Sequence, residues 1–125
     1  MSFEPAPPWP IELTLRELGL SWPETHEDFP WGERALKVKG KMFGLLGTSD
    51  RGFFFTVKLP LSAAAATSQP WAKPTGYGLG RSGWISARFE EPGEVPEDLL
   101  RDWMCESYRA VAPKALVKRL AADEP

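Results

Sequence analysis

The sequence predicts an α+β fold in which helices cover one face of an antiparallel β-sheet and leave the other face open. In residues 35–39, 53–59 and 84–89, apolar residues alternate with polar ones, as in strands with one buried face. Residues 9–18 and 96–112 instead carry apolar residues at helical spacing. Turn signals at Gly40 and at residues 49–52 separate three of the strands closely enough for an antiparallel meander.

The chain length and composition predict a single domain. The 125 residues suffice for one hydrophobic core, and the 42% hydrophobic and 26% charged residues are typical of globular proteins. Residues 1–8 are rich in proline, and we expect them to form a flexible lead. Residues 9–120 are expected to form the domain.

The cysteine content points to a reducing compartment. Cys105 is the single cysteine, which excludes an internal disulfide and a cysteine-rich zinc site. No apolar run reaches the roughly 18 residues that a membrane span needs, and residues 1–10 do not resemble a signal peptide. We therefore expect a cytoplasmic protein with no membrane association.

The first predicted helix precedes an acidic connector. Its apolar stripe consists of Ile11, Leu15 and Leu18. Gly19 follows at the position where glycine commonly ends a helix, and Glu12 and Glu17 are expected on the polar side. Residues 20–30 contain Pro23, Pro30 and several acids, so we expect a connector without regular structure.

Strand alternation assigns side chains to the two faces of the sheet. In residues 35–39, Leu36 and Val38 share one face, and Lys37 and Lys39 share the other. In residues 53–59 the buried set is Phe53, Phe55, Val57 and Leu59, which leaves Phe54, Thr56 and Lys58 on the open face. In residues 84–89 the buried set is Ile85, Ala87 and Phe89, so Trp84 and Arg88 are expected to join the open face.

The segments around the last strand are a short helix, a loop and two further helices. The alanine-rich residues 61–68 predict a short helix, and the glycine-rich residues 71–83 predict a flexible loop carrying Tyr77 and Arg81. The helix of residues 96–112 has the apolar stripe Leu99, Leu100, Trp103, Met104, Tyr108 and Val111. Pro113 breaks it, and a last short helix packs Leu116, Val117 and Leu120.

Charge is distributed unevenly along the chain. The net charge of the whole chain is −2, whereas residues 31–89 carry nine Lys and Arg against two Asp and Glu. The two terminal segments are acidic, with net charges of −5 for residues 1–30 and −4 for residues 90–125. The predicted sheet is therefore a basic region between acidic termini, which indicates either a binding face or a solvated surface.

The sequence contains no recognisable catalytic or metal-binding pattern. His26 is the single histidine, and Cys105 has no histidine nearby in the sequence that would make it a nucleophile. No phosphate-binding loop or spaced set of metal ligands is present. We therefore expect no enzyme activity, no cofactor and no bound metal.

Five sequence blocks in order resemble the MmcQ/YjbR family. They are HEDFPWG at 26–32, KVKGKMFGLL at 37–46, VKLP at 57–60, GRSGWI at 80–85 and ESYRAVAPK at 106–114. The resemblance covers about residues 18–114 and implies a fold similar to bacterial frataxin. It also implies DNA binding, with the motif lysines at Lys37, Lys39, Lys41, Lys58 and Lys114. The net acidic charge departs from what tight nonspecific DNA binding would require.

These observations leave three functions open. The first is a nucleic-acid-binding module using a basic, aromatic-containing sheet face, with the candidate residues Lys37, Lys39, Lys41, Lys58, Arg81, Trp84, Arg88 and Lys114. The second is a non-catalytic protein-interaction or small-ligand module that docks an acidic partner on the same face. The third is iron handling by acids of the N-terminal region, namely Glu12, Glu17, Glu24, Glu27 and Asp28. No pattern specifies an oligomeric state.

Overall fold

The computed structural model describes residues 7–30, 32–76 and 79–123, and only the backbone of residues 121–123. The helices are α1 (Pro10–Leu20), α2 (Ala63–Thr67), α3 (Glu97–Val111) and α4 (Lys114–Asp123), and short 3-10 turns form η1 (Leu79–Ser82) and η2 (Pro92–Glu94). The strands are β1 (Thr25–Asp28), β2 (Arg34–Val38), β3 (Lys41–Ser49), β4 (Gly52–Lys58), β5 (Ala72–Pro74) and β6 (Trp84–Phe89).

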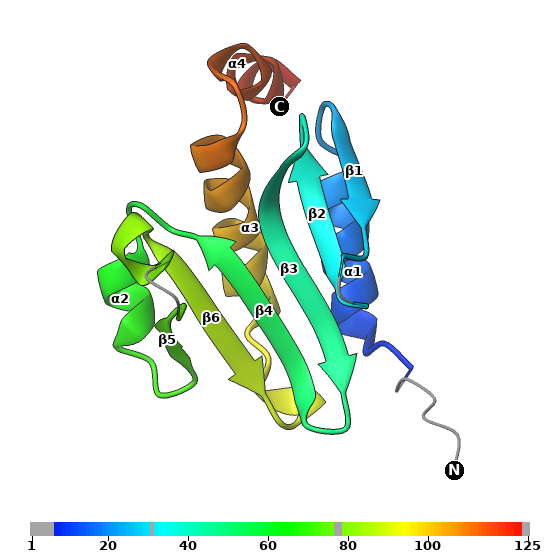
Figure 1. The fold of residues 1–125 in the computed structure, drawn as a ribbon, viewed down its shortest axis with the longest axis vertical. Coiled ribbons are helices and arrows are strands. Elements are labelled where there is room, and N and C mark those ends of the chain that lie inside the picture. The colour runs from blue at the N-terminus through cyan, green and yellow to red at the C-terminus, as the bar shows by residue number, and fades with distance from the viewer. Residues whose placement is uncertain (1–6, 31, 77–78, 124–125) are drawn as a thin grey trace.

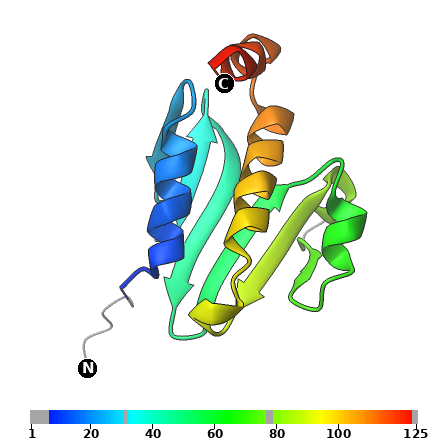
Figure 2. The same ribbon diagram turned by 180° about the vertical axis from the view of Figure 1, so that it is seen from behind.

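The strands form one antiparallel sheet of six strands, in the order β1-β2-β3-β4-β6-β5 (Figure 1). Helices α1 and α3 lie side by side across one face of this sheet (Figure 2). The opposite face, which we call the open face, carries no helix of the described chain and is turned toward the viewer in Figure 1. The predicted α+β architecture, with helices on one face of an antiparallel sheet, is therefore confirmed.

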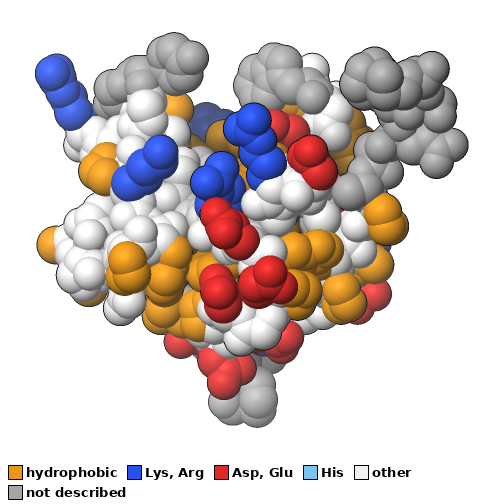
Figure 3. All heavy atoms as spheres, turned by 90° about the horizontal axis from the view of Figure 1, so that it is seen from below, with side chains coloured by type: hydrophobic (Ala, Val, Ile, Leu, Met, Phe, Trp, Pro, Cys, Tyr) orange, Lys and Arg blue, Asp and Glu red, His pale blue; other side chains and the backbone are white. Residues whose placement is uncertain are grey.

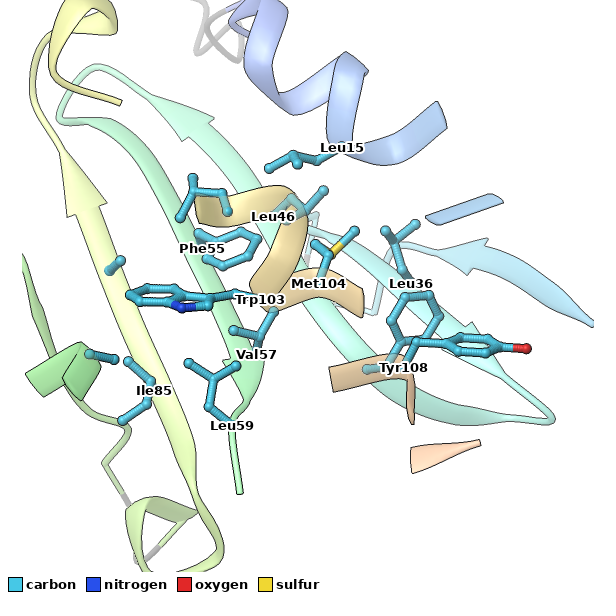
Figure 4. Close-up of a cluster of buried hydrophobic side chains, with 14 of the residues drawn as sticks. Leu15, Leu36, Leu46, Phe55, Val57, Leu59, Ile85, Trp103, Met104 and Tyr108 are labelled. Carbon is cyan, nitrogen blue, oxygen red and sulfur yellow. The ribbon is translucent and has the colours of Figure 1, made fainter. Parts of the chain in front are cut away.

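The core fills the layer between the sheet and the helices α1 and α3. Leu36, Val57 and Ile85, which alternation assigned to the buried face, have exposed fractions of 0%, 0% and 2%. Figure 4 shows these side chains converging with Trp103 and Met104 of α3. The parity predicted from the sequence is therefore correct in three strands, and burial of this apolar surface is the main stabilising contribution to the fold.

Helix α1 continues through Gly19, so the prediction that this glycine ends the helix is wrong. Gly19 is buried, and a Cβ atom added to it would lie 2.8 Å from Leu36 Cδ1 and 3.2 Å from Met104 Cε. The missing side chain allows the helix to approach the sheet and α3 closely. Ser21 caps the helix instead, and its hydroxyl donates a hydrogen bond to the carbonyl of Leu18.

Two segments predicted as irregular contain edge strands. The acidic connector includes β1, which pairs with β2, and the glycine-rich loop includes β5, which pairs with β6. Both strands are short and lie at opposite edges of the sheet. An edge strand is paired on one side only, so it needs no run of alternating apolar residues. The prediction for Tyr77 lies outside the described residues.

The hairpin between β2 and β3 corrects the placement of Lys39. Lys39 has a φ of 52° and Gly40 a φ of 80°, which is the backbone of a tight turn between the two strands. Lys39 is therefore a turn residue rather than an outward-facing strand residue. A bulge follows in β3, where Leu36 pairs with Gly44 and Lys37 with Met42, so that Phe43 is left unpaired and buried.

Helix α4 lies beyond one end of the sheet (Figure 1). The predicted flexible lead over residues 1–8 falls mostly on residues 1–6, which lie outside the described residues, and its division from a domain of residues 9–120 stays a prediction. The last helix, α4, begins directly after Pro113, as predicted. No helix within the described ranges combines the length and the apolar character that crossing a membrane requires.

Candidate binding site on the open face

Three successive cross-strand pairs form the centre of the open face. They join β4 to β6 and are Phe54 with Arg88, Thr56 with Ser86, and Lys58 with Trp84. Successive pairs are two residues apart along the strands, a separation of about 7 Å. Each outer pair combines one cation with one aromatic ring, and the middle pair combines two hydroxyl groups.

The ring of Phe54 lies across the neighbouring strand β3. Its cross-strand partner there is Gly47, and a Cβ atom added to Gly47 would come within 2.2 Å of Phe54 Cζ. Glycine at this position therefore lets the ring rest directly on the backbone of β3. Phe54 remains half-buried, so part of the ring is available on the open face.

The middle pair belongs to a row of three hydroxyl groups, which we call the hydroxyl row: Thr56, Ser86 and Thr75. The oxygen Ser86 Oγ lies 3.1 Å from Thr56 Oγ1 and 2.9 Å from Thr75 Oγ1. Each hydroxyl can donate one hydrogen bond and accept others. Three hydroxyls that share two hydrogen bonds keep one O–H donor and several lone pairs for another group.

A hollow of about 620 Å³ opens beside this row, where β5 begins alongside the second half of β6. Strand β5 places Lys73 directly opposite Ser86. Lys73 and Arg88 line the hollow together with the aromatic residues Phe54 and Trp71. The exposed residues Glu90 and Glu94 contribute carboxylates to the same hollow.

The structure brings three of the predicted site residues together. Lys58, Trp84 and Arg88 lie on the open face of β4 and β6, as strand alternation predicted. Lys37 lies on the open face as well, but on β2, where its ammonium group is 3.0 Å from Asp28 Oδ2. The hydrogen bond from Lys37 lowers the pKa of the Asp28 carboxyl, with a smaller contribution from the backbone amide of Phe29. The charge of Lys37 is therefore balanced locally.

The other predicted residues lie elsewhere. Lys39 is in the β2–β3 turn, with its ammonium group 3.9 Å from Glu24 Oε2. Lys41 begins β3 opposite Val38, in the row that faces the helices, and Lys114 is the first residue of α4. Arg81 is an exposed residue of η1, a turn whose Gly80 packs against Pro74 of β5. These residues do not extend the central group into one continuous basic face.

Sequence reasoning missed Lys73 as a site residue and did not detect the hydroxyl row. Lys73 lies in a strand of three residues, too short to produce a recognisable alternation. Thr56 and Ser86 are visible as outward positions of their strands, but their contact depends on the pairing of β4 with β6, which are separated by more than twenty residues.

The end of the molecule next to the hollow carries mixed charge. Figure 3 shows acidic side chains gathered at this end with basic ones beside them. The residues that surround the small depression there are Asp50, Arg51, Arg88, Glu90 and Glu91. The positive charge of the open face therefore does not continue over this end.

Four of the five acids proposed as iron ligands, Glu12, Glu24, Glu27 and Asp28, are engaged in ion pairs. Glu12, predicted on the polar side of its helix, is instead buried, and it accepts hydrogen bonds from Arg34 and Thr48. Glu27 accepts from Arg16 and Arg34. The described part of the chain contains no group of three or more His, Cys, Asp or Glu that could hold a metal ion. These carboxylates give no geometric support for iron handling.

Comparison with known proteins gives a family and a fold. The family model described as YjbR matches residues 20–110. A similar solved structure is the crystal structure of the Deinococcus radiodurans protein DR2400, whose domain is described as DUF419. It superposes with a TM-score of 0.66 and 26% identity, over 86% of this chain and 85% of that one. No curated protein matches the chain.

Proposed function

This chain belongs to the YjbR family, and we propose that it binds nucleic acid on the open face of its sheet. The observation that carries the proposal is the row of cross-strand pairs on β4 and β6, in which cations and aromatic rings alternate around two hydroxyls. Proteins that bind single-stranded nucleic acid combine positive charge with aromatic side chains on which the bases stack.

The cations of the open face would neutralise phosphates. Within the described chain, no carboxylate lies within ion-pair distance of Lys58 or Lys73, and the Arg88 guanidinium is 3.9 Å from its nearest carboxylate, that of Glu90. The charges of Lys58 and Lys73 are therefore available to a ligand, and Arg88 is held only by a long, exposed ion pair. Contacts of this kind supply most of the sequence-independent affinity for nucleic acid.

The aromatic residues would stack on bases. Phe54 and Trp84 lie on adjacent strands and are separated by four residue positions, a distance of about 13 Å along the strands. Stacking of one base on an aromatic side chain contributes roughly 1–3 kcal/mol. In this proposal the protein is a binding module without a reaction of its own, and it acts in the cytosol.

The net charge of −2 is compatible with this role because the charges lie on different sides. Several exposed acids, Glu97, Asp98 and Asp102, belong to α3, which covers the opposite face of the sheet. Charges separated by more than about 10 Å are largely screened at ordinary ionic strength. The local potential at Lys58, Lys73 and Arg88 can therefore be positive although the molecule is negative.

The test is the salt dependence of binding, measured by fluorescence anisotropy with a short duplex and with a single strand. Each phosphate contact contributes about −0.9 to the slope of log affinity against log salt for a duplex, and about −0.7 for a single strand. The double variant Lys58→Ala with Arg88→Ala should therefore flatten the slope by between one and two. The matched control, Lys118→Ala with Arg119→Ala on α4, removes the same charge elsewhere and should leave the slope unchanged.

Two further variants distinguish the contributions to affinity. Trp84→Ala should weaken binding and leave the slope unchanged, because stacking is not ionic. Lys37→Ala should have a smaller effect than Lys58→Ala, because Asp28 already balances Lys37. Absence of binding by the wild-type protein at low salt would reject the proposal. If the protein instead binds an acidic protein through Lys58 and Arg88, that result would support the alternative of a partner-docking module.

A further inference from the structure

We propose that the hollow beside the hydroxyl row holds one unpaired base, so that the protein selects single-stranded over duplex nucleic acid. This inference rests on the proposed function and assigns a ligand class to one part of the open face. It is drawn from the chemistry of the groups that line the hollow, which differs from that of the surrounding face.

The charged groups around the hollow can bind the base and the phosphate of one nucleotide at different places. Lys73 and Arg88 line the hollow and can contact phosphate oxygens. Glu90 and Glu94 also line it, and their carboxylates repel phosphate but accept hydrogen bonds from the N–H groups of a base. A nucleotide whose base enters the hollow and whose phosphate stays near the cations satisfies both kinds of charge.

The hydroxyl row suits the edge of any base. Thr56 and Ser86 line the hollow, and Thr75 completes the row through the hydrogen bond between its hydroxyl and that of Ser86. Each of the two shared hydrogen bonds can run in either direction, so the row can present either a donor or an acceptor to the ligand. This adaptability favours recognition of an unpaired base as a class rather than of one base identity.

The two aromatic residues of the hollow are fixed by packing, Trp71 against the core and Phe54 against β3. The Trp71 ring centroid lies 4.9 Å from that of Phe89 and 5.6 Å from that of Trp103, both buried residues. The Phe54 ring rests on Gly47. The hollow therefore needs little rearrangement to receive a flat ring, and its volume of about 620 Å³ is within the usual range for small-ligand sites.

A duplex cannot use this hollow without losing its own contacts. Its bases are paired and stacked, and turning one out of the helix costs a few kcal/mol. A single strand has unpaired bases and avoids most of that cost. The phosphate contacts of the open face are available to both ligands, so filling the hollow should weaken binding of a single strand and leave binding of a duplex unchanged.

The decisive variant is Ser86→Tyr, because the larger side chain fills the hollow without changing its charge. Affinity for a single strand should fall about tenfold, the contribution of one stacked base, while the duplex affinity and both salt slopes stay as in the wild type. The matched control is Leu45→Tyr, which adds bulk to the open face on β3, at the residue paired with Thr56 on the side away from the hollow. It should leave the single-strand preference intact.

The outcomes separate this inference from the proposed function. If the wild-type protein binds a duplex as tightly as a single strand, or if Ser86→Tyr binds a single strand unchanged, the hollow is not a base site although the open face still binds nucleic acid. Failure of the wild-type protein to bind any nucleic acid would overturn both.

Should Ser86→Tyr fail to fold, titration of the wild-type protein with the mononucleotide dAMP provides an independent test. The nuclear magnetic resonance signals of the Trp71 indole N–H and the Arg88 backbone amide should shift. Shifts confined to other parts of the protein, or no shift at the highest soluble concentration, would contradict the inference.

Discussion

The guanidinium of Arg34 lies 3.1 Å from the carboxylate of Glu12 beneath helix α1, where the two side chains are only 12% and 7% exposed. Thr48 donates to the other oxygen of this carboxylate at 2.8 Å, and Arg34 also donates to Glu27. The network joins α1 to β1, β2 and β3. Unlike the open face, it has no charge left for a ligand, since two arginines meet two glutamates once Arg16 is included.

Arg34→Met is expected to lower the free energy of unfolding by about 3–5 kcal/mol, because it leaves the buried Glu12 carboxylate without its partner. Adding Glu12→Leu to Arg34→Met should cost less than the sum of the two single changes, which measures their coupling. Urea denaturation provides the values. Lys39→Met serves as the control. It removes a long, exposed ion pair with Glu24 and should change stability little. Strict additivity of Arg34→Met and Glu12→Leu would contradict the coupling.

Stability should fall in acid partly because of Glu27. The hydrogen bond from Arg16, followed by that from Arg34, lowers the pKa of the Glu27 carboxyl from its ordinary value of 4.5. A lowered pKa in the folded state stabilises the protein above pH 4.5, and this contribution is lost as the pH falls through the folded-state pKa. Glu27→Gln should therefore reduce stability at neutral pH and lose less than the wild type on acidification.

The measurement is the urea midpoint at neutral pH and at several values below pH 4.5. Asp102→Asn, at an exposed position of α3, is the control and should follow the wild-type profile. A Glu27→Gln variant whose stability falls as steeply in acid as that of the wild type would show that this carboxylate does not contribute.

Trp103→Ala is expected to destabilise the protein by about 3–5 kcal/mol, as large core deletions do. Trp103 is 5% exposed and packs on Trp71 beneath β6. Leu61→Ala is the comparison, because Leu61 is 88% exposed and its loss should cost about 0.5 kcal/mol or less. If both variants unfolded at the same midpoint in a guanidinium titration, Trp103 would not contribute to the core.

Gly52→Ala should destabilise the β3–β4 hairpin. Gly52 has a φ of 110°, and an added Cβ atom would lie 2.0 Å from the backbone oxygen of Phe89. The backbone strain alone costs of order 1–3 kcal/mol. Gly93→Ala, where an added Cβ atom meets nothing within 4 Å, should be neutral. Equal thermal midpoints for the two variants would mean that the hairpin relaxes without cost.

The sequence predicts the layers of this fold because burial follows alternation. Val57 and Ile85 lie in strands long enough to show a period of two, and Trp103 lies in a helix long enough to show an apolar stripe. The edge strands β1 and β5 have three or four residues, and most of their side chains are partly exposed. Their hydrogen bonds depend on β2 and β6, so local sequence carries little signal for them.

The candidate site is predictable only where a single strand determines it. The outward positions of Lys58, Trp84 and Arg88 follow from alternation alone. The balance of Lys37 by Asp28 and the contact between Thr56 and Ser86 depend on which strands are neighbours. The burial of Glu12 depends on an arginine 22 residues away in the chain, a relationship that helical periodicity cannot reveal.

The position of β6 between β4 and β5 has a consequence for the chain as it is synthesised. Strands β1 to β4 pair with their neighbours in sequence, whereas β4 must wait for β6, which follows α2 and β5. Until residues 84–89 emerge from the ribosome, the edge of β4 is unpaired, and Phe53 and Phe55 stay partly uncovered until α3, which packs on β4, has followed. Exposed strand edges of this kind promote aggregation. Fragments that end before Trp84 should therefore precipitate during expression, and the full-length chain should depend most on chaperones at this stage of its synthesis.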